Sequence, residues 1–330
     1  HGKGTVEREF LKALMLGVSS TDGLTPIKQE IAERAVAHFG DLYEMADKPG
    51  PGCTYFFDLS MRKPAARVMK SHQTNPTVRY FGAATALPAL RHLMDVIKTK
   101  HAIPGDVNLG GSYDLDLVSS VLSHLDMYWS DKPPARSHER RNIATRLTVV
   151  NGLDQIFRSI RPLTDGLSLD FQAKDFGESW IVENISDGGY GAIVPQVKGD
   201  WLKVGALIGV QTETSKYWGV GVIRRLTRDE FQQRRVGIQL VSKAIIPVKL
   251  SAAGSVSSIN PLREGESAVL LSTGPDKHGE IALLLKVGTY SQTQALEMDV
   301  GGKRYYLMPR KLVEGGEDFD WGRFKVMKND

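Results

Sequence analysis

The spacing of hydrophobic residues divides this chain into a helical part and a strand-forming part. In the first part, apolar positions recur at intervals of three and four, which is typical of amphipathic helices. The pattern predicts four helices, over residues 6–16, 27–39, 87–98 and 114–129. The last one ends at Asp131-Lys-Pro-Pro, because proline removes a backbone donor and favours an extended path. We therefore predict a helical N-terminal domain over residues 1–130.

After the two prolines, the pattern changes to short runs of apolar and β-branched residues that are separated by turn residues. The first such runs lie at residues 147–150, 180–185, 192–197, 202–211, 217–223 and 236–241. They predict a small antiparallel barrel or sandwich over residues 147–245. Residues 165–176, rich in Asp and Gly, form an unusually long connection within it.

A second β-rich segment is expected over residues 246–330. Its strand candidates lie at residues 268–271, 281–287, 294–299 and 304–307. Asp299-Val-Gly301-Gly302 is a hairpin signal between the last two. The two β segments are candidates for degenerate copies of one barrel. The fold class expected is thus multidomain α+β, with a helical domain, a small antiparallel β-barrel and a β-rich C-terminal domain.

Charge is concentrated in one short window. Residues 131–161 contain seven basic and three acidic side chains, a surplus of four that equals the net charge of +4 of the whole chain. The remainder is balanced, which favours a local anion site over a broad nucleic-acid-binding face. Residues 131–146 are therefore interpreted as an arginine-rich linker between the helical domain and the first barrel.

Two motifs carry the candidate chemistry. The linker contains four arginines, whose planar guanidinium groups can grip phosphate and the Hoogsteen edge of guanine: Arg136, Arg140, Arg141 and Arg146. Asn184-Ile-Ser186-Asp-Gly-Gly189 lies between two strand-like runs and offers small polar groups and an open backbone. Together they indicate a site for a guanine-containing phosphate ligand, although a solvated basic linker and a plain turn are the simpler alternatives.

With these motifs in this order, residues 136–245 resemble a PilZ domain, a bacterial module known as a receptor for cyclic di-GMP. That family has an arginine-rich linker just before the first barrel strand and an Asp/Asn-x-Ser-x-x-Gly turn on the barrel surface. Trp218-Gly-Val-Gly-Val-Ile-Arg-Arg225 and Val236-Gly-Ile-Gln-Leu240 are similar to its later strands. The resemblance implies cyclic di-GMP as the ligand of the four arginines, Asn184, Ser186 and Gly189.

The arginine motif departs from the family pattern in its spacing. Arg136 and Arg140 have the usual separation, whereas Arg140-Arg141 followed by Arg146 resembles the doubled form with one extra residue. We expect Arg140 and Arg141 to be the core ligands, with Arg146 and Arg136 next. The register stays open at the sequence level.

Little in the sequence favours catalysis. The chain has no nucleophile elbow, P-loop or dinucleotide fingerprint, and its eight histidines show no metal-ligand spacing. Cys53 is the only cysteine, which excludes an intrachain disulfide and a cysteine-based zinc site and fits a reducing cytosol. The longest apolar runs, such as residues 281–285, are too short to span a bilayer. We expect no enzyme activity, no metal, no cofactor and a cytoplasmic location.

The function expected from the sequence is a bacterial second-messenger effector. Binding of cyclic di-GMP would order the linker, change the arrangement of the domains and signal to an unknown protein partner. Two other classes stay open: a PilZ-like adaptor that works by protein contacts without ligand, and a barrel that binds single-stranded nucleic acid.

Overall fold

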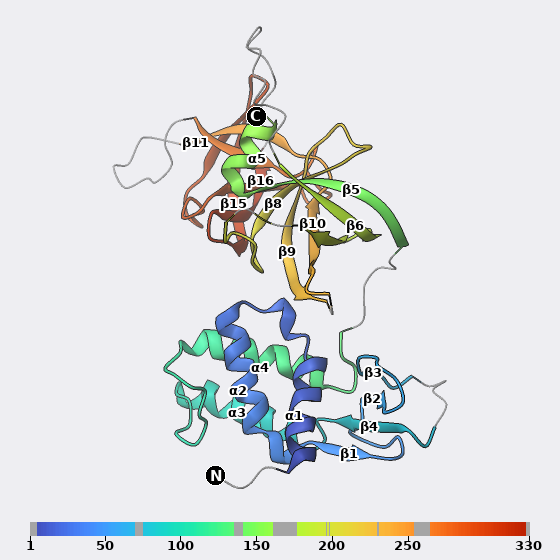
Figure 1. Cartoon of the computed structure of the whole chain (residues 1–330). Coiled ribbons are helices and arrows are strands. Elements are labelled where there is room, and N and C mark those ends of the chain that lie inside the picture. Colours follow the sequence, from blue (N-terminus) through green and yellow to red (C-terminus); the bar gives the residue numbers. More distant parts are fainter. Residues whose placement is uncertain are drawn as a thin grey trace. The chain divides into compact units, whose positions relative to one another are not determined.

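The computed structural model describes residues 5–69, 75–134, 141–160, 177–195, 197, 199–229, 231–253 and 265–327. The chain divides into two compact units, residues 1–136 and residues 137–330. The first unit holds the long helices, and the second holds two closed antiparallel barrels (Figure 1). The multidomain α+β fold class expected from the sequence is confirmed.

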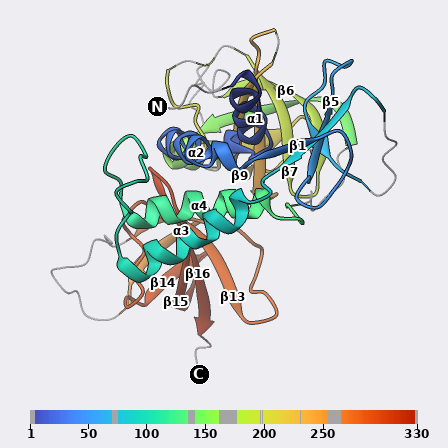
Figure 2. The same cartoon turned by 90° about the horizontal axis from the view of Figure 1, so that it is seen from below.

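Four helices form most of the first unit: α1 (Val6–Val18), α2 (Pro26–His38), α3 (Ala86–Lys100) and α4 (Leu115–Trp129). Side-chain caps explain where two of them begin. Thr5 Oγ1 accepts a hydrogen bond from Arg8 N at 3.2 Å, and Asp114 Oδ1 accepts one from Asp116 N at 2.8 Å. The helices α3 and α4 lie side by side (Figure 2). The apolar stripes of all four helices share one core that includes Met15, Ile31, Leu90, Leu122 and Trp129.

The first unit also contains a small antiparallel sheet that the hydrophobic pattern did not predict. Its strands are β1 (Glu44–Ala46), β2 (Tyr55–Asp58), β3 (Ala66–Arg67) and β4 (Val78–Gly82), in the order β1-β4-β2-β3. Each strand has five residues or fewer, which is too short for an alternating pattern to stand out. Tyr55, Phe57 and Phe81 place aromatic rings from this sheet in the helical core.

The first barrel follows the linker. Its strands are β5 (Arg141–Asn151), β6 (Glu178–Ser186), β7 (Gly189–Val194), β8 (Leu207–Thr212), β9 (Gly219–Arg228) and β10 (Arg234–Ser242). They close in the order β10-β7-β6-β5-β8-β9, and Leu147, Trp180, Val182 and Ile223 are among the side chains that fill the interior. A helix, α5 (Gly152–Ile160), follows β5. The long connection expected at residues 165–176 lies outside the described residues.

The second barrel consists of β11 (Ile246–Ala252), β12 (Glu266–Leu270), β13 (Glu280–Lys286), β14 (Leu296–Val300), β15 (Lys303–Gly315) and β16 (Phe319–Met327). The predicted hairpin between β14 and β15 is present, and Gly302 N donates to Asp299 Oδ1 at 3.0 Å. The ring order is β11-β12-β13-β16-β15-β14. In both barrels the first three strands are consecutive neighbours and are followed by the sixth, fifth and fourth. The barrels thus share one topology, and their origin as copies of one unit stays a prediction.

The two barrels are joined by an apolar core of their own. The helix α5 contacts β8 of the first barrel and β11 of the second, and it contributes Leu153 and Ile156 to this core. Val220 and Val222 from β9 meet Leu284 from β13 and Phe319 from β16. Strands at this interface are buried on both faces, so β9 and β13 carry nearly continuous apolar runs instead of an alternating pattern.

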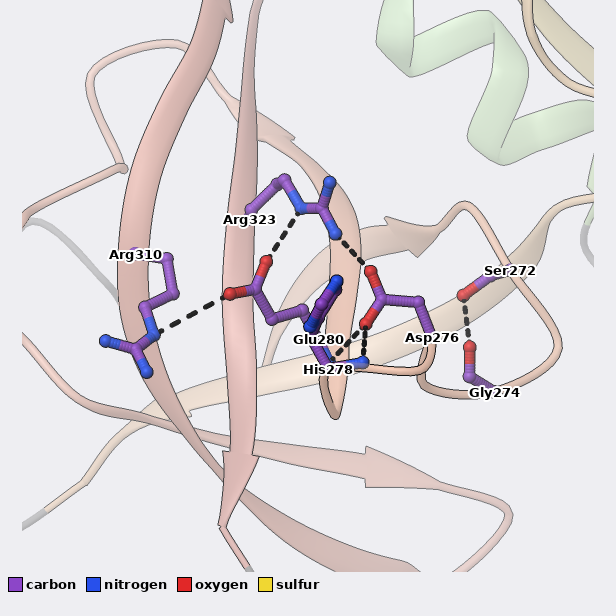
Figure 3. A network of polar contacts seen from close by, with 7 residues as sticks. All are labelled: Ser272, Gly274, Asp276, His278, Glu280, Arg310 and Arg323. Carbon is purple, nitrogen blue, oxygen red and sulfur yellow. Dashed lines mark hydrogen bonds and ion pairs between the residues drawn. The ribbon is translucent and has the colours of Figure 1, made fainter.

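An ion-pair network covers part of the outside of the second barrel (Figure 3). Glu280 on β13 pairs with Arg323 on β16 at 3.0 Å and lies 3.8 Å from Arg310 on β15. Arg323 also pairs with Asp276, which accepts hydrogen bonds from His278 N at 2.8 Å and Glu280 N at 3.0 Å. The charges of this network compensate one another, so it closes the β12–β13 turn and offers no open anion site.

Candidate ligand-binding site

The strand pairing brings the arginine motif and the Asn-x-Ser-x-x-Gly turn together. Arg141, the first residue of β5, lies opposite Ile185 on β6, and Asn142 lies opposite Asn184. The end of the linker therefore enters the barrel beside the turn, although the two motifs are about forty residues apart in the sequence. Arg136 and Arg140 lie outside the described residues.

The extra residue in the arginine motif is absorbed by a β-bulge. Between Asn142 and Thr145 the chain advances three residues on β5, whereas β6 advances two, from Asn184 to Val182. A bulge of this kind takes up one residue and changes the direction of the side chains next to it. Beyond it the ladder is regular, and Arg146 lies exposed opposite Ile181, on the outer face of the barrel.

The side chains of Arg141, Arg146 and Asn184 have no polar partners within the described part of the chain. Other arginines of the same barrel are paired: Arg235 contacts Glu183 at 2.8 Å and Asp229 at 3.1 Å. Hydrogen bonds from guanidinium groups to anions are about twice as strong as neutral ones. The paired strands β5 and β6 thus carry two unpaired guanidinium groups and one unpaired amide, which are groups that can accept an anion.

Asn184 lies on the outer face and covers the backbone of the neighbouring strand β7. It pairs with Gly191 on β7, and a Cβ at Gly191 would lie 2.7 Å from both Nδ2 and Oδ1 of Asn184. Gly191 pairs with Gly237 on β10, which in turn pairs with Arg225 on β9. Neighbouring residues on these strands face the interior, so this row faces outward. The amide of Asn184 therefore covers Gly191, which is buried, and the half-buried Gly237 lies between Gly191 and the stem of Arg225.

The two remaining turn residues, Ser186 and Gly189, have different surroundings. Ser186 Oγ donates to Gly189 O at 3.4 Å, a long contact that leaves the hydroxyl able to turn toward a ligand. At Gly189, with φ of 154°, a Cβ would lie 1.8 Å from the carbonyl oxygen of Ile238 on β10. Gly189 thus permits β7 to approach β10, and the role expected for it beside a ligand stays a prediction.

Two residues next to the turn were not among the predicted ligands, although both lie in segments that resemble the later strands of PilZ domains. Gln239 lies opposite Gly189 on β10, and its Oε1 accepts a hydrogen bond from Arg224 Nε at 2.7 Å. Arg224 also binds Glu314 of the second barrel, 90 residues away. Within those segments, nothing in the sequence distinguishes Arg224 and Gln239 from their neighbours. Only the β9–β10 pairing shows that they are neighbours of the site.

The structure gives no sign of a metal centre or a membrane-spanning helix in the residues that it describes. No group of three or more His, Cys, Asp and Glu side chains is placed to hold a metal ion in that part of the chain. None of the described helices is long and apolar enough to cross a bilayer. The groups that the site offers are guanidinium, amide, hydroxyl and backbone, which suit ligand binding.

A comparison with curated proteins found no match for the chain. A family model matches residues 175–247, a segment that begins after the arginine cluster and contains β6 to β10. This segment includes the turn at Asn184, Ser186 and Gly189, so the match supports the barrel and the turn but does not extend to the arginines. Its description is the middle PilZ domain of the cyclic-di-GMP receptor FimW, which confirms the similarity of this barrel to PilZ domains.

Proposed function

We propose that this protein is a receptor for cyclic di-GMP that binds its ligand on the outer face of the first barrel. The observation that carries the proposal is the pairing of β5 with β6, which sets the unpaired Arg141 beside the Asn184–Gly189 turn. The match of residues 175–247 to a PilZ domain of a cyclic-di-GMP receptor supports the choice of ligand.

In this proposal the arginines supply charge and the turn supplies recognition. Arg140 and Arg141 contact the phosphates or the O6 and N7 atoms of guanine, and Arg136 and Arg146 assist them. Asn184 and Ser186 hydrogen-bond to the ligand from the barrel side. A guanine ring can approach the backbone at Gly237, because this residue has no side chain to exclude it.

The same ligand would order the linker. Clustered like charges repel one another, and an anion that neutralises them favours one compact arrangement. Arg136 lies where the two compact units join in the chain, and Arg140 directly precedes β5. Ordering this stretch changes the arrangement of the helical unit relative to the barrels, which is an order-on-binding switch read by a protein partner. The receptor acts without catalysis or a cofactor, in the bacterial cytoplasm.

Titration calorimetry of the full chain with cyclic di-GMP tests the proposal. We expect Arg141→Ala to weaken binding by about 1.5–3 kcal/mol, or roughly ten- to hundredfold, because a charged group loses its partner. Arg228→Ala is the matched control, since Arg228 belongs to the same barrel but lies at the far end of the β9–β10 ladder, opposite Arg234. The control variant should bind like the wild type.

Other outcomes identify the competing functions. Absence of binding by the wild type would reject the ligand and favour an adaptor that acts through protein contacts. Unchanged binding after replacement of both Arg140 and Arg141 would reject these residues as ligands. Binding of single-stranded DNA that weakens steeply between two salt concentrations would indicate a nucleic-acid-binding barrel.

A further inference from the structure

The turn of the proposed site rests directly on β10. Leu240 N donates a hydrogen bond to the carbonyl oxygen of Gly188 at 2.9 Å. Gly189 pairs with Gln239, and a Cβ on Gly189 would lie 3.2 Å from the Gln239 Cα. There is no side chain between the turn and this strand to absorb a displacement. The backbone of β10 at Gln239 and Leu240 is therefore the part of the barrel on which the turn rests.

Gln239 is in turn held by an arginine that a β-bulge presents to it. On β9, Arg225 pairs with Gly237 and Ile223 pairs with Ile238, so Arg224 is the extra residue between them. Its Nε donates to Gln239 Oε1 at 2.7 Å. Bulges often re-aim a side chain, and here the bulge directs the guanidinium along the outer face of the barrel.

The other side of the same guanidinium is bound by the second barrel. Arg224 Nη1 and Nη2 donate to Glu314 Oε1 and Oε2 at 2.6 and 2.5 Å, so the carboxylate is held by two parallel hydrogen bonds. The Glu314 side chain is only 26% exposed, which reduces solvent screening of the pair. Two parallel bonds also restrict the orientation of the guanidinium plane more than one bond does.

The apolar core between the barrels restricts the movement of Arg224 and Glu314 relative to each other. Val220 and Val222, on the same strand as Arg224, pack in that core with Leu284 and Phe319 of the second barrel. A close-packed core does not deform continuously. Glu314 is therefore held at a set position relative to β9.

We infer that the second barrel is a structural part of the proposed ligand site: Glu314 holds Arg224, Arg224 holds Gln239, and Gln239 positions the Gly188–Gly189 turn. This inference rests on the proposed function, because it concerns the site described for cyclic di-GMP. Glu314, Arg224 and Gln239 are positioning residues. By thermodynamic linkage, ligand binding at the turn also strengthens the contact between the barrels.

A pair of matched variants tests the inference. Glu314→Gln keeps the shape of the side chain and removes its charge. Glu317→Gln makes the same change in a second ion pair between the barrels, since Glu317 binds Lys203, which lies between β7 and β8 and is outside the contacts of Glu314, Arg224 and Gln239. We expect Glu314→Gln to weaken cyclic di-GMP binding roughly five- to tenfold and Glu317→Gln to leave it within about twofold. Melting curves of both variants verify that they are folded.

A double-mutant cycle shows whether the three residues act in series. Gln239→Leu should weaken binding in the wild type but add little to Glu314→Gln, because both substitutions break the same chain of contacts. Equal affinity of the wild type and Glu314→Gln would overturn the inference. Full additivity of the two substitutions would overturn it as well.

Hydrogen exchange without ligand separates this inference from the proposed function. The amide of Leu240 should exchange faster in Glu314→Gln than in Glu317→Gln, because its bond to the Gly188 carbonyl loses support. If the wild type does not bind cyclic di-GMP, the proposed function fails, and the exchange result alone decides the positioning role. Equal exchange in the two variants would then reject it.

Discussion

At the scale of single residues, the glycines of the first barrel have different roles although they look alike in the sequence. Gly189 is required by the barrel, because its position leaves no room for a Cβ against the carbonyl of Ile238. Gly237 lies on the outer face, and a Cβ there would meet only the Cβ of Arg225, at 3.2 Å. Gly191 faces the amide of Asn184. The same residue type thus permits strand packing at Gly189, makes room for the Asn184 amide at Gly191 and leaves a flat outer surface at Gly237.

We expect Gly189→Ala to destabilise the second unit by about 1–3 kcal/mol, the usual cost of an overpacked site. The new Cβ would displace β7 from β10, since the atom that it meets belongs to the backbone and cannot rotate away. Gly237→Ala is the control and should cost less than about 1 kcal/mol. Urea unfolding of the two variants measures the difference. A Gly189→Ala protein as stable as wild type would show that the turn has more room than the structure indicates.

At the scale of elements, the end of α1 is joined to α4 by a buried polar contact. Ser19, which caps α1, is fully buried, and its carbonyl oxygen accepts a hydrogen bond from His124 Nε2 at 2.7 Å. Its hydroxyl donates to Met15 O at 2.6 Å and accepts from Trp129 Nε1 at 2.9 Å. Burial lowers the pKa of His124 below its ordinary value of 6.5, against the smaller opposing effect of the Ser19 carbonyl.

This contact makes the helical unit sensitive to pH. Because the folded-state pKa of His124 is lowered, the unfolded chain binds the proton more readily, and stability is lost as the pH falls from 6.5 toward the folded-state pKa. Above pH 6.5 the contribution is fully present. His124→Gln keeps a donor for Ser19 O but does not titrate, so its stability should vary less over this range. Urea unfolding followed by helical circular dichroism between pH 5 and 8 checks this, and parallel pH profiles of the two proteins would refute it.

At the scale of the whole molecule, the two barrels are held together by an apolar interface that belongs to neither interior. The helix α5 and the outer faces of β9 and β13 form this interface. Gly152 at the start of α5 has φ of 74°, and Leu153 N donates to Asp318 Oδ2 of the second barrel at 2.7 Å. Because burial is shared in this way, we expect the two barrels to unfold as a single cooperative body.

We expect Leu284→Ala to destabilise both barrels together. Leu284 is fully buried in the shared core, and loss of such a side chain costs about 2–5 kcal/mol. Val287 directly follows β13 and is 53% exposed, so Val287→Ala should change stability by less than about 0.5 kcal/mol. Hydrogen exchange measures protection in each barrel separately. Loss of protection in the second barrel alone would contradict a shared cooperative unit.

Much of the fold could be predicted from local patterns. The four long helices and most barrel strands follow from periodicity, since each depends on residues that are close in the sequence. The small sheet of the first unit could not be predicted, because strands such as β3, with two residues, carry no periodic signal. The helix α5 was also missed, because it follows β5 directly and its apolar residues continue those of the strand.

The candidate site was also predictable only in its local features. Its motifs are local, so Arg141, Arg146, Asn184 and Ser186 were identified by type and order, and the match to a PilZ domain agrees with the turn. The bulge that accommodates the extra residue of the arginine motif could not be predicted, since it is defined by the pairing with β6. Arg136 and Arg140, which are also predicted to bind the ligand, lie outside the described residues.

The sequence by itself determined the order of the domains, the chemistry of the two motifs and the similarity to PilZ domains, because these depend on residue types and on spacing along the chain. Only the tertiary structure decided which side chains share the outer face, why Gly189 is needed against β10, and that Glu314 reaches Arg224 from 90 residues away. Those facts depend on strand register and on packing between barrels, and no local pattern encodes a contact between strands that are distant in sequence.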